Sequence, residues 1–349
     1  MNWLRCLVIG VAGLAAAAAQ TPVADLNALG NQAMDRRDYA AAESYYRKAI
    51  EEFRNLGPAY EAHLAASLFN LGIAFCVEGN RAEAARYYEE ALALHRRALG
   101  PKHLRTVTNV NRMAGNYLTL GDVERAEGLY TEALLIEREL YPNDVQLAYS
   151  LCGLAAAHLR KGQNGDVLAL AEEALDVARR TAGDTSLDAA QMYANVAEIH
   201  RTFGRPDRAL PLYRKARFIY EKAPGSADSR AWSTLSQEGL ILMGEGKLTL
   251  AEQALTQALD GLGKSCPSCI PEVSVAENNL GLLRLKQKRY ADADQLLSHA
   301  LLLQEEYLAR PSREMADTLR NLAVVREKQR LHADAVRLQN RATMILGLR

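Results

Sequence analysis

The 349-residue chain has few of the residues that usually carry catalysis, metal binding or crosslinking. It contains five cysteines, two tryptophans and seven histidines. The histidines form no i, i+4 pair and no H-E-x-x-H motif, and no G-x-S-x-G sequence occurs, so no local pattern predicts a metalloprotease or a serine hydrolase. The single C-x-x-C lacks the further ligands that a zinc site needs. We therefore expect no catalytic residues, no metal and no cofactor.

An excess of charge of either sign is also absent. The chain has 42 basic and 42 acidic side chains, which gives a formal net charge of zero, and they are interspersed along its whole length. Nucleic acids and anionic membranes recruit proteins through basic blocks or patches. The composition therefore argues against nucleic acid or a charged membrane surface as the main partner.

Long apolar runs are missing, except at the start of the chain. Arg5 is followed by fourteen uncharged, mostly apolar residues from Cys6 to Ala19, and Ala17, Ala18 and Ala19 directly precede Gln20. This pattern is typical of a signal peptide with an A-x-A cleavage site. A membrane span needs roughly 18 or more apolar residues, so an uncleaved anchor is the weaker alternative. We predict that residues 1–19 are a signal peptide, that the protein is periplasmic or extracellular, and that the mature chain has no membrane span.

What the chain does have is a repeat with a period of 42 residues. An alanine recurs at the same position in every repeat. A bulky residue stands three positions before it, with exceptions at Ala171 and Gln339, and a small residue stands seven positions before it, with an exception at Val167. Small, large and small residues at these steps mark one face of a helix. The alanines are Ala49, Ala91, Ala133, Ala174, Ala216, Ala258, Ala300 and Ala342, and the bulky residues are Tyr46, Tyr88, Tyr130, Tyr213, Leu255 and Leu297.

An earlier segment of each repeat carries another small residue, followed seven positions later by a turn residue. Two helices approach closely only where side-chain bulk is missing, and a large residue there would cost about 1–3 kcal/mol. Glycine at the turn position suits a left-handed helix C-terminus. Each unit is therefore predicted to be helix, tight turn, helix. The small residues are Gly30, Gly72, Ala114, Ala155, Ala197, Gly239, Gly281 and Ala323, and the turn residues are Arg37, Gly79, Gly121, Gly162, Gly204, Gly246, Lys288 and Arg330.

The segment from Asn70-Leu71-Gly72 through Gly79 to Tyr88 and Ala91 resembles the tetratricopeptide repeat signature. The 42-residue period, with the sequence Leu99-Gly100-Pro101-Lys102-His103 between repeats, resembles the kinesin light chain subclass. The resemblance implies an all-α, right-handed superhelical solenoid of about eight helix-turn-helix repeats over residues 22–349, with first helices lining a concave groove. The expected repeats span residues 22–56, 57–99, 100–141, 142–182, 183–224, 225–266, 267–310 and 311–349. Repeat four is the most degenerate, which predicts a local change of curvature.

The resemblance also implies a binding surface on the first helices. An asparagine stands just before the Leu-Gly or Leu-Ala pair at several repeats, and a ladder of amides can pair with the main chain of an extended peptide. The alternative is that these amides satisfy neighbouring helices or face water. The asparagines are Asn70, Asn195, Asn279 and Asn321, and further groove candidates are Phe69, Ile73, Asn111, Arg112, Glu198, Arg201, Asn278, Leu282, Lys286, Arg320 and Lys328. The last two repeats are basic here, which suits an acidic or carboxylate ligand, although a solvated face explains the charges equally well.

The cysteines and the glycine-containing segment 258–265 are assigned structural roles. Cys266 and Cys269 are predicted to form a disulfide in an oxidising compartment, whereas Cys76 and Cys152 are expected to be buried free thiols. Residues 258–265 match a relaxed P-loop pattern, but they fall on a repeat helix with no preceding strand. We therefore expect no nucleotide.

These observations favour a scaffold that binds a protein or an extended peptide in its groove, rather than an enzyme. The alternative is self-assembly, because the last helix has no polar capping helix after it. Its apolar residues are Val336, Leu338, Met344, Ile345, Leu346 and Leu348. A homodimer would form through that helix. An enzyme with a site inside the groove is the least supported interpretation.

Overall fold

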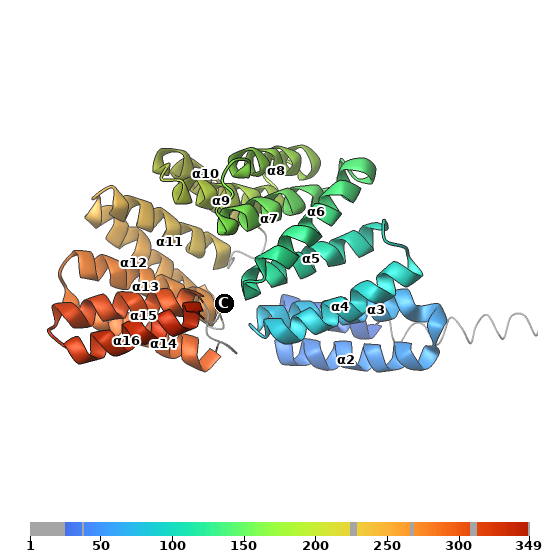
Figure 1. Cartoon of the computed structure of the whole chain (residues 1–349), viewed down its shortest axis with the longest axis horizontal. Helices are drawn as coiled ribbons and strands as arrows, with labels where there is room; N and C mark the ends of the chain where they lie inside the picture. The colour runs from blue at the N-terminus through green and yellow to red at the C-terminus, as the bar shows by residue number, and fades with distance from the viewer. Residues whose placement is uncertain (1–24, 37, 224–228, 266–268, 308–312, 348–349) are drawn as a thin grey trace, which may run out of the picture. The chain divides into compact units, whose positions relative to one another are not determined.

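The structure is a computed structural model that describes residues 25–36, 38–223, 229–265, 269–307 and 313–347. Within these ranges the chain is built from helices joined by short turns, and no strand occurs in them (Figure 1). The predicted signal peptide, residues 1–19, lies outside the described residues. The predicted all-α fold of about eight helix-turn-helix repeats is confirmed.

Each repeat consists of a first helix and a second helix that pack on each other, as α3 packs on α4 and α13 packs on α14. The first helices are a helix over residues 25–35, α3 (Glu61–Val77), α5 (Leu104–Leu120), α7 (Gln146–Lys161), α9 (Leu187–Thr202), α11 (Ser229–Gly244), α13 (Ile270–Lys286) and α15 (Arg313–Lys328). The second helices are α2 (Tyr39–Leu56), α4 (Arg81–Ala98), α6 (Val123–Leu140), α8 (Val167–Ala182), α10 (Pro206–Lys222), α12 (Leu248–Ser265), α14 (Tyr290–Tyr307) and α16 (His332–Gly347). A short 3-10 helix, η1 (Pro58–Tyr60), precedes α3.

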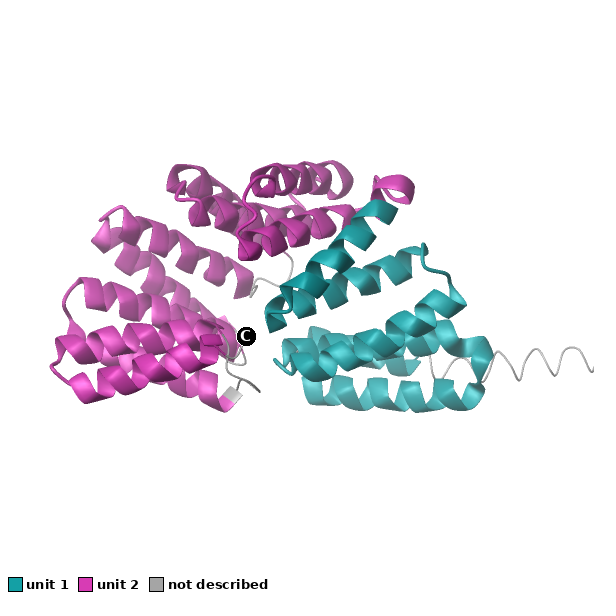
Figure 2. Cartoon of the chain, in the orientation of Figure 1, with its two compact units in different colours: residues 1–136 teal, residues 137–349 magenta. Residues whose placement is uncertain are grey.

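The helices form two compact units, residues 1–136 and residues 137–349, and the division falls within α6 (Figure 2). We refer to them as unit 1 and unit 2 and describe each by itself. The superhelical handedness of the array and the change of curvature at repeat four stay predictions.

The period-42 alanines lie at the centre of the packing in both units. All eight of them, from Ala49 to Ala342, have no exposed surface. The bulky residues three positions earlier are also buried, from Tyr46 in the first repeat to Leu297 in the seventh. In repeat eight the position is taken by Gln339, which is exposed. The repeat pattern therefore identified the core correctly.

The glycines of the first helices make room for the bulky residues of the second helices. A Cβ atom added to Gly72 would lie 2.8 Å from the Tyr88 ring, and one added to Gly281 would lie 2.8 Å from Leu297. Since real Cβ atoms do not approach other atoms so closely, the small residue sets the distance between the two helices. The predicted helix crossing is thus confirmed at these pairs.

The turn residues adopt the left-handed conformation that the sequence predicts. Gly79, Gly121, Gly162, Gly204 and Gly246 have φ values between 66° and 89°. Lys288 and Arg330 take the same conformation, with φ of 63° and 66°, although they carry a side chain. Position 37, in the corresponding place of the first repeat, lies outside the described residues.

By length and composition alone, one stretch of the described residues, Pro58–Val77, could cross a membrane. In the structure its Leu64, Leu68 and Leu71 are buried in unit 1. The helix packs on α4 and on α2, so its apolar composition is explained by its place within the core.

Candidate peptide-binding surface

In unit 2 the first helices of successive repeats are joined by side-chain amides. α13 contacts both α11 and α15. Asn321 Nδ2 donates to Asn278 Oδ1 at 3.0 Å, Asn278 Nδ2 donates to Asn279 Oδ1 at 3.4 Å, and Asn279 Nδ2 donates to Ser236 Oγ at 3.0 Å. This chain of amides crosses three repeats.

Asn279 is therefore committed to the interior. It is 4% exposed, and both its amide nitrogen and its oxygen have partners within the protein. A buried amide that lacked hydrogen-bond partners would destabilise the folded protein. Asn279 fits the alternative interpretation, in which the asparagines link neighbouring helices, while Asn278 and Asn321 remain half-buried and reach the surface.

Asn195 on α9 has a similar structural role nearer the N-terminus of unit 2. Its Oδ1 accepts a hydrogen bond from Gln191 Nε2 at 3.0 Å, and its side chain also bonds to the Cys152 thiol on α7. Cys152 is buried, and this burial raises the pKa of its thiol to about 11. The thiol is therefore protonated at neutral pH and acts as a structural group.

Glu198 and Arg201 form an ion pair on α9 that the protein itself satisfies. Arg201 Nε lies 2.8 Å from Glu198 Oε2, and the Tyr213 hydroxyl donates to the same carboxylate oxygen at 2.6 Å. Burial and the nearby carboxylate raise the pKa of Tyr213, so the hydroxyl keeps its proton. These two charges stabilise the contact between α9 and α10 and are not free groups awaiting a ligand.

The next three first helices carry an apolar row. Leu282 on α13 is half-buried, and the residues 42 positions before and after it are Leu240 on α11 and Val324 on α15. Leu240 is half-buried and Val324 is 46% exposed. The sequence-based prediction included only Leu282, but the 42-residue period would have identified the other two.

Basic side chains flank this row. Lys286 and Lys328 are exposed and occupy the same register in successive repeats, and Lys286 Nζ donates to the Met243 carbonyl at 2.7 Å. Arg320 is also exposed and lies 3.7 Å from Asp317. Lys328 forms no ion pair with any residue in the described part of the chain. We call the combined surface the α11–α15 face, and it consists of Leu240, Asn278, Leu282, Lys286, Arg320, Asn321, Val324 and Lys328.

In unit 1 the corresponding candidates lie on α3 and α5. Phe69 is half-buried with its ring centroid 5.6 Å from that of Tyr88, and Ile73 is half-buried one turn further along α3. Asn111 is only 6% exposed, whereas Arg112 is exposed. Asn70 is half-buried. This surface is more apolar than the α11–α15 face.

The remaining motifs have structural places. Residues 258–265 lie within α12, so they form a helix and not a phosphate-binding loop. Cys76 and Cys152 are free thiols, as predicted, but only Cys152 is buried; the predicted burial of Cys76 is wrong, since its side chain is half-buried. Cys269 is buried and disulfide-bonded, while Cys266 lies outside the described residues, so the pair Cys266–Cys269 stays a prediction. Among the described residues no group of three or more His, Cys, Asp or Glu side chains is placed to hold a metal ion.

Comparison with known proteins agrees with this architecture. The family model of the tetratricopeptide repeat matches residues 63–139, 107–179, 145–222 and 272–346. These matches cover more than half of the chain. The chain therefore belongs to the tetratricopeptide repeat family. No curated protein sequence matches it.

Solved structures of low sequence identity share the fold. A Rap protein complexed with competence and sporulation factor has a TM-score of 0.70 and 16% identity, over 88% of this chain and 80% of that chain. The apo form of the quorum sensor NprR from B. thuringiensis has a TM-score of 0.65 and 15% identity, over 92% of this chain and 86% of that chain. A Rap conjugation gene regulator of the plasmid pLS20, in complex with the Phr* peptide, has a TM-score of 0.61 and 17% identity, over 80% of this chain and 72% of that chain.

Proposed function

We propose that this protein is a non-enzymatic interaction scaffold that binds an extended peptide or a peptide-like segment of a partner protein on the α11–α15 face. The observation that carries the proposal is the partly exposed row of Leu240, Leu282 and Val324 beside the exposed lysines 286 and 328. Apolar side chains of a peptide would occupy the row, and the amides of Asn278 and Asn321 would bond to its main chain.

The charge of the face favours an acidic ligand. Glu327 is hydrogen-bonded to His332, and Asp317 lies 3.7 Å from Arg320, so both carboxylates have partners other than the two lysines. Lys328 is available to a peptide carboxylate, either an acidic side chain or a C-terminus, and Lys286 retains two N–H donors besides the one that bonds to the Met243 carbonyl. Two of the structurally similar proteins are named as complexes with a signalling factor or peptide, which supports a peptide ligand for this fold.

Affinity capture tests the proposal. The full chain would be compared with Lys286→Glu/Lys328→Glu, which reverses two charges of the face, and with Lys48→Glu/Lys222→Glu, which reverses two exposed charges on second helices. We expect a partner retained by the wild type and by the second variant to be lost by the first. Equal retention by both variants would contradict binding at this face.

We also propose export, on the basis of the signal-like residues 1–19. N-terminal sequencing of the protein isolated from its native source tests this. A mature chain beginning near Gln20 is expected, whereas a protein that retains Met1 inside the cell would contradict export.

Self-association through α16 is the second candidate, and the structure changes which residues would mediate it. Ile345 is 7% exposed and packs with Leu319 and Leu322, and Leu338 and Leu346 pack against the same cluster. Val336 and Met344 are 58% and 62% exposed. Light scattering of Val336→Glu/Met344→Glu is therefore the test, because Ile345→Glu would disrupt the core. A monomeric mass for both wild type and variant would exclude the dimer.

A further inference from the structure

Repeat six departs from the repeat pattern by exchanging a small residue for a large one. In the first helix of each repeat, one position lies seven residues before the small residue at the helix crossing. The residue at this position is buried in every repeat other than six for which the structure describes it. These residues are Ala65, Val107, Ala148, Ala190, Ser274 and Ala316, none more than 2% exposed. In repeat six the position is held by Trp232, which is half-buried.

A second substitution accommodates the indole. The residue three positions after the repeated alanine is Leu94, Ile136, Val177, Ile219, Leu303 or Ile345 in most other repeats, but it is Gly261 in repeat six. A Cβ atom added to Gly261 would clash with the Trp232 ring. Trp232 Nε1 donates to Ser265 Oγ at 3.0 Å, and Ser265 Oγ donates to the Gly261 carbonyl at 2.6 Å. The ring is thus fixed in one orientation over a glycine.

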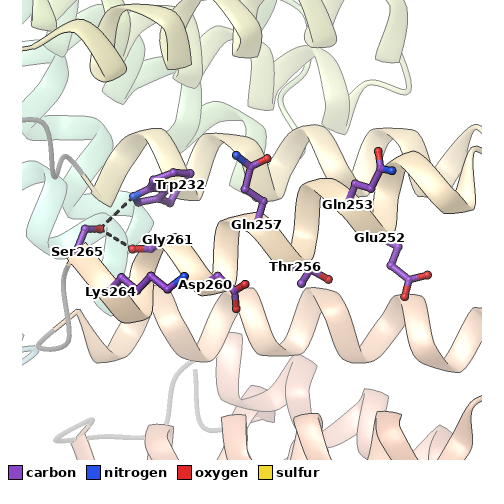
Figure 3. A pocket seen from close by; sticks show the side chains of 9 residues that line it. All are labelled: Trp232, Glu252, Gln253, Thr256, Gln257, Asp260, Gly261, Lys264 and Ser265. Carbon is purple, nitrogen blue, oxygen red and sulfur yellow. Dashed lines mark hydrogen bonds between the residues drawn. The ribbon is translucent and has the colours of Figure 1, made fainter.

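The fixed indole lines a surface cavity of about 660 Å³ that is otherwise formed by α12 (Figure 3). We call it the Trp232 cavity; its other lining residues are Glu252, Gln253, Thr256, Gln257, Asp260, Gly261, Lys264 and Ser265. Its volume lies within the range of small-ligand sites. None of these residues belongs to the α11–α15 face.

The Trp232 cavity offers an aromatic ring, a helix C-terminus and one exposed carboxylate to a positively charged group. The face of an indole attracts cations, and the cavity includes the last turn of α12, where the helix dipole is negative. Glu252 already pairs with Arg284 and accepts from Gln287 at 2.8 Å. Asp260 is exposed and forms no ion pair with any residue that the structure describes. Lys264 opposes a cation, but its exposed ammonium group lies on a flexible stem that can turn to solvent.

We propose that the Trp232 cavity binds an organic cation, a guanidinium or quaternary ammonium group, which stacks on the Trp232 indole with Asp260 as its counter-charge. The site is separate from the peptide-binding face and does not depend on the function proposed for it. The large Trp232 ring packs against Gly261, which has no side chain, and the hydrogen bond from Trp232 Nε1 to the Ser265 hydroxyl fixes the orientation of the indole.

Tryptophan fluorescence reads this site directly. The chain has two tryptophans, Trp3 and Trp232, so Trp3→Phe in the full chain leaves Trp232 as the only indole. Titration with N-acetyl-arginine amide is expected to give a saturable change, and the neutral analogue N-acetyl-citrulline amide is expected to bind several-fold more weakly. Equal responses to the two probes would overturn the proposal.

Charge variants test the sign of the interaction. In the Trp3→Phe background, Asp260→Asn should weaken binding of the arginine probe by about twofold to fivefold, and Lys264→Gln should strengthen it. Asp176→Asn, at an exposed carboxylate on α8, is the matched control and should change nothing. An affinity unaffected by either cavity variant would contradict the proposal.

The cation could belong to a protein or to a small molecule, and two further probes separate these sources. A peptide with one arginine between glycines that binds more tightly than tetramethylammonium points to an arginine side chain of a partner. The reverse order points to a small quaternary amine. No saturable response to any of the cationic probes overturns the proposal.

Discussion

At the scale of single residues, the packing depends on where side-chain volume is absent. Gly72 and Gly281 each lie against one large side chain of the following helix, and neither has space for a methyl group. Gly261 likewise lies against the Trp232 ring, but it belongs to a second helix, α12, and not to a first helix. The same residue type thus sets the helix spacing in several repeats and builds a distinct feature in one of them.

The first prediction concerns this spacing. Gly72→Ala should lower the free energy of unfolding by about 1–3 kcal/mol, because the new Cβ atom would overlap the buried Tyr88 ring. Gly244→Ala is the matched control, since no atom lies within 4 Å of its added Cβ. Urea unfolding measures both, and equal stability of the two variants would contradict the role of Gly72.

The second prediction concerns the turn positions of the last two repeats. Lys288 and Arg330 hold a left-handed conformation that is unfavourable for residues with a side chain. Lys288→Gly should therefore raise the free energy of unfolding by about 1 kcal/mol. The reverse change at an equivalent turn, Gly246→Ala, should lower it by a similar amount. Urea unfolding is again the measurement, and a destabilised Lys288→Gly protein would show that the side chain makes contacts that outweigh the strain.

At the scale of helices, charged and polar side chains form contacts between neighbouring repeats. Arg54 pairs with Glu90 at 2.7 Å, and Arg138 pairs with Glu173 at 2.8 Å, in each case between successive second helices. These pairs are exposed, so each is expected to contribute less than about 1 kcal/mol. The buried amide of Asn279 and the buried imidazole of His95 are expected to affect the free energy of unfolding more, because a polar group in the interior cannot exchange its surroundings for water.

The third prediction is a pH dependence that arises in unit 1. His95 on α4 is 2% exposed, and burial, together with the charges of Arg105 and His103, lowers the pKa of its imidazole to about 4. A histidine whose pKa falls on folding stabilises the protein above its unfolded pKa of about 6.5, and this stability is lost as the pH falls towards 4. Between pH 7 and pH 5 the loss should be about 2 kcal/mol.

Thermal unfolding across this pH range tests the His95 prediction. His95→Leu should remove most of the dependence, while His332→Gln, at an exposed histidine on α16, should retain it. If the wild type and His95→Leu lose stability equally on acidification, another group is responsible.

The helices also show how far the sequence could predict the structure. The alanine period identified one fully buried position in the second helix of every repeat, because each second helix buries the same face and the period repeats that face. The partners of Asn279 and the inward position of Ile345 could not be predicted, since they depend on how one repeat is rotated against the next. The Trp232 cavity was not predicted either, although the sequence carries a signal for it, because Trp232 and Gly261 both break the size pattern of the repeat.

At the scale of the whole molecule, each repeat packs mainly on its neighbours, and the chain divides into two compact units within α6. Stability in such arrays is close to a sum of local terms, so damage in one repeat should spread only a short distance. The two candidate binding surfaces belong to different units, with an apolar set on α3 in unit 1 and the basic α11–α15 face in unit 2.

The fourth prediction follows from this local packing. Gly72→Ala should increase the rate of hydrogen exchange in α2 to α4, while the rates in α13 to α16 should change little. Hydrogen exchange read by mass spectrometry gives both values in one experiment. A uniform increase along the chain would show that the array unfolds as a single cooperative block.

The central claim is that the α11–α15 face binds an extended peptide, and site-specific photocrosslinking tests it most directly. A photoreactive amino acid would replace Leu282 in the full chain, and a second variant would carry it at Leu250, which is 51% exposed on α12. Both would be irradiated in an extract from the native source. The account predicts a crosslinked partner from position 282 that an acidic competitor peptide displaces, and none from position 250. A partner crosslinked at position 250 and absent at position 282 would contradict it.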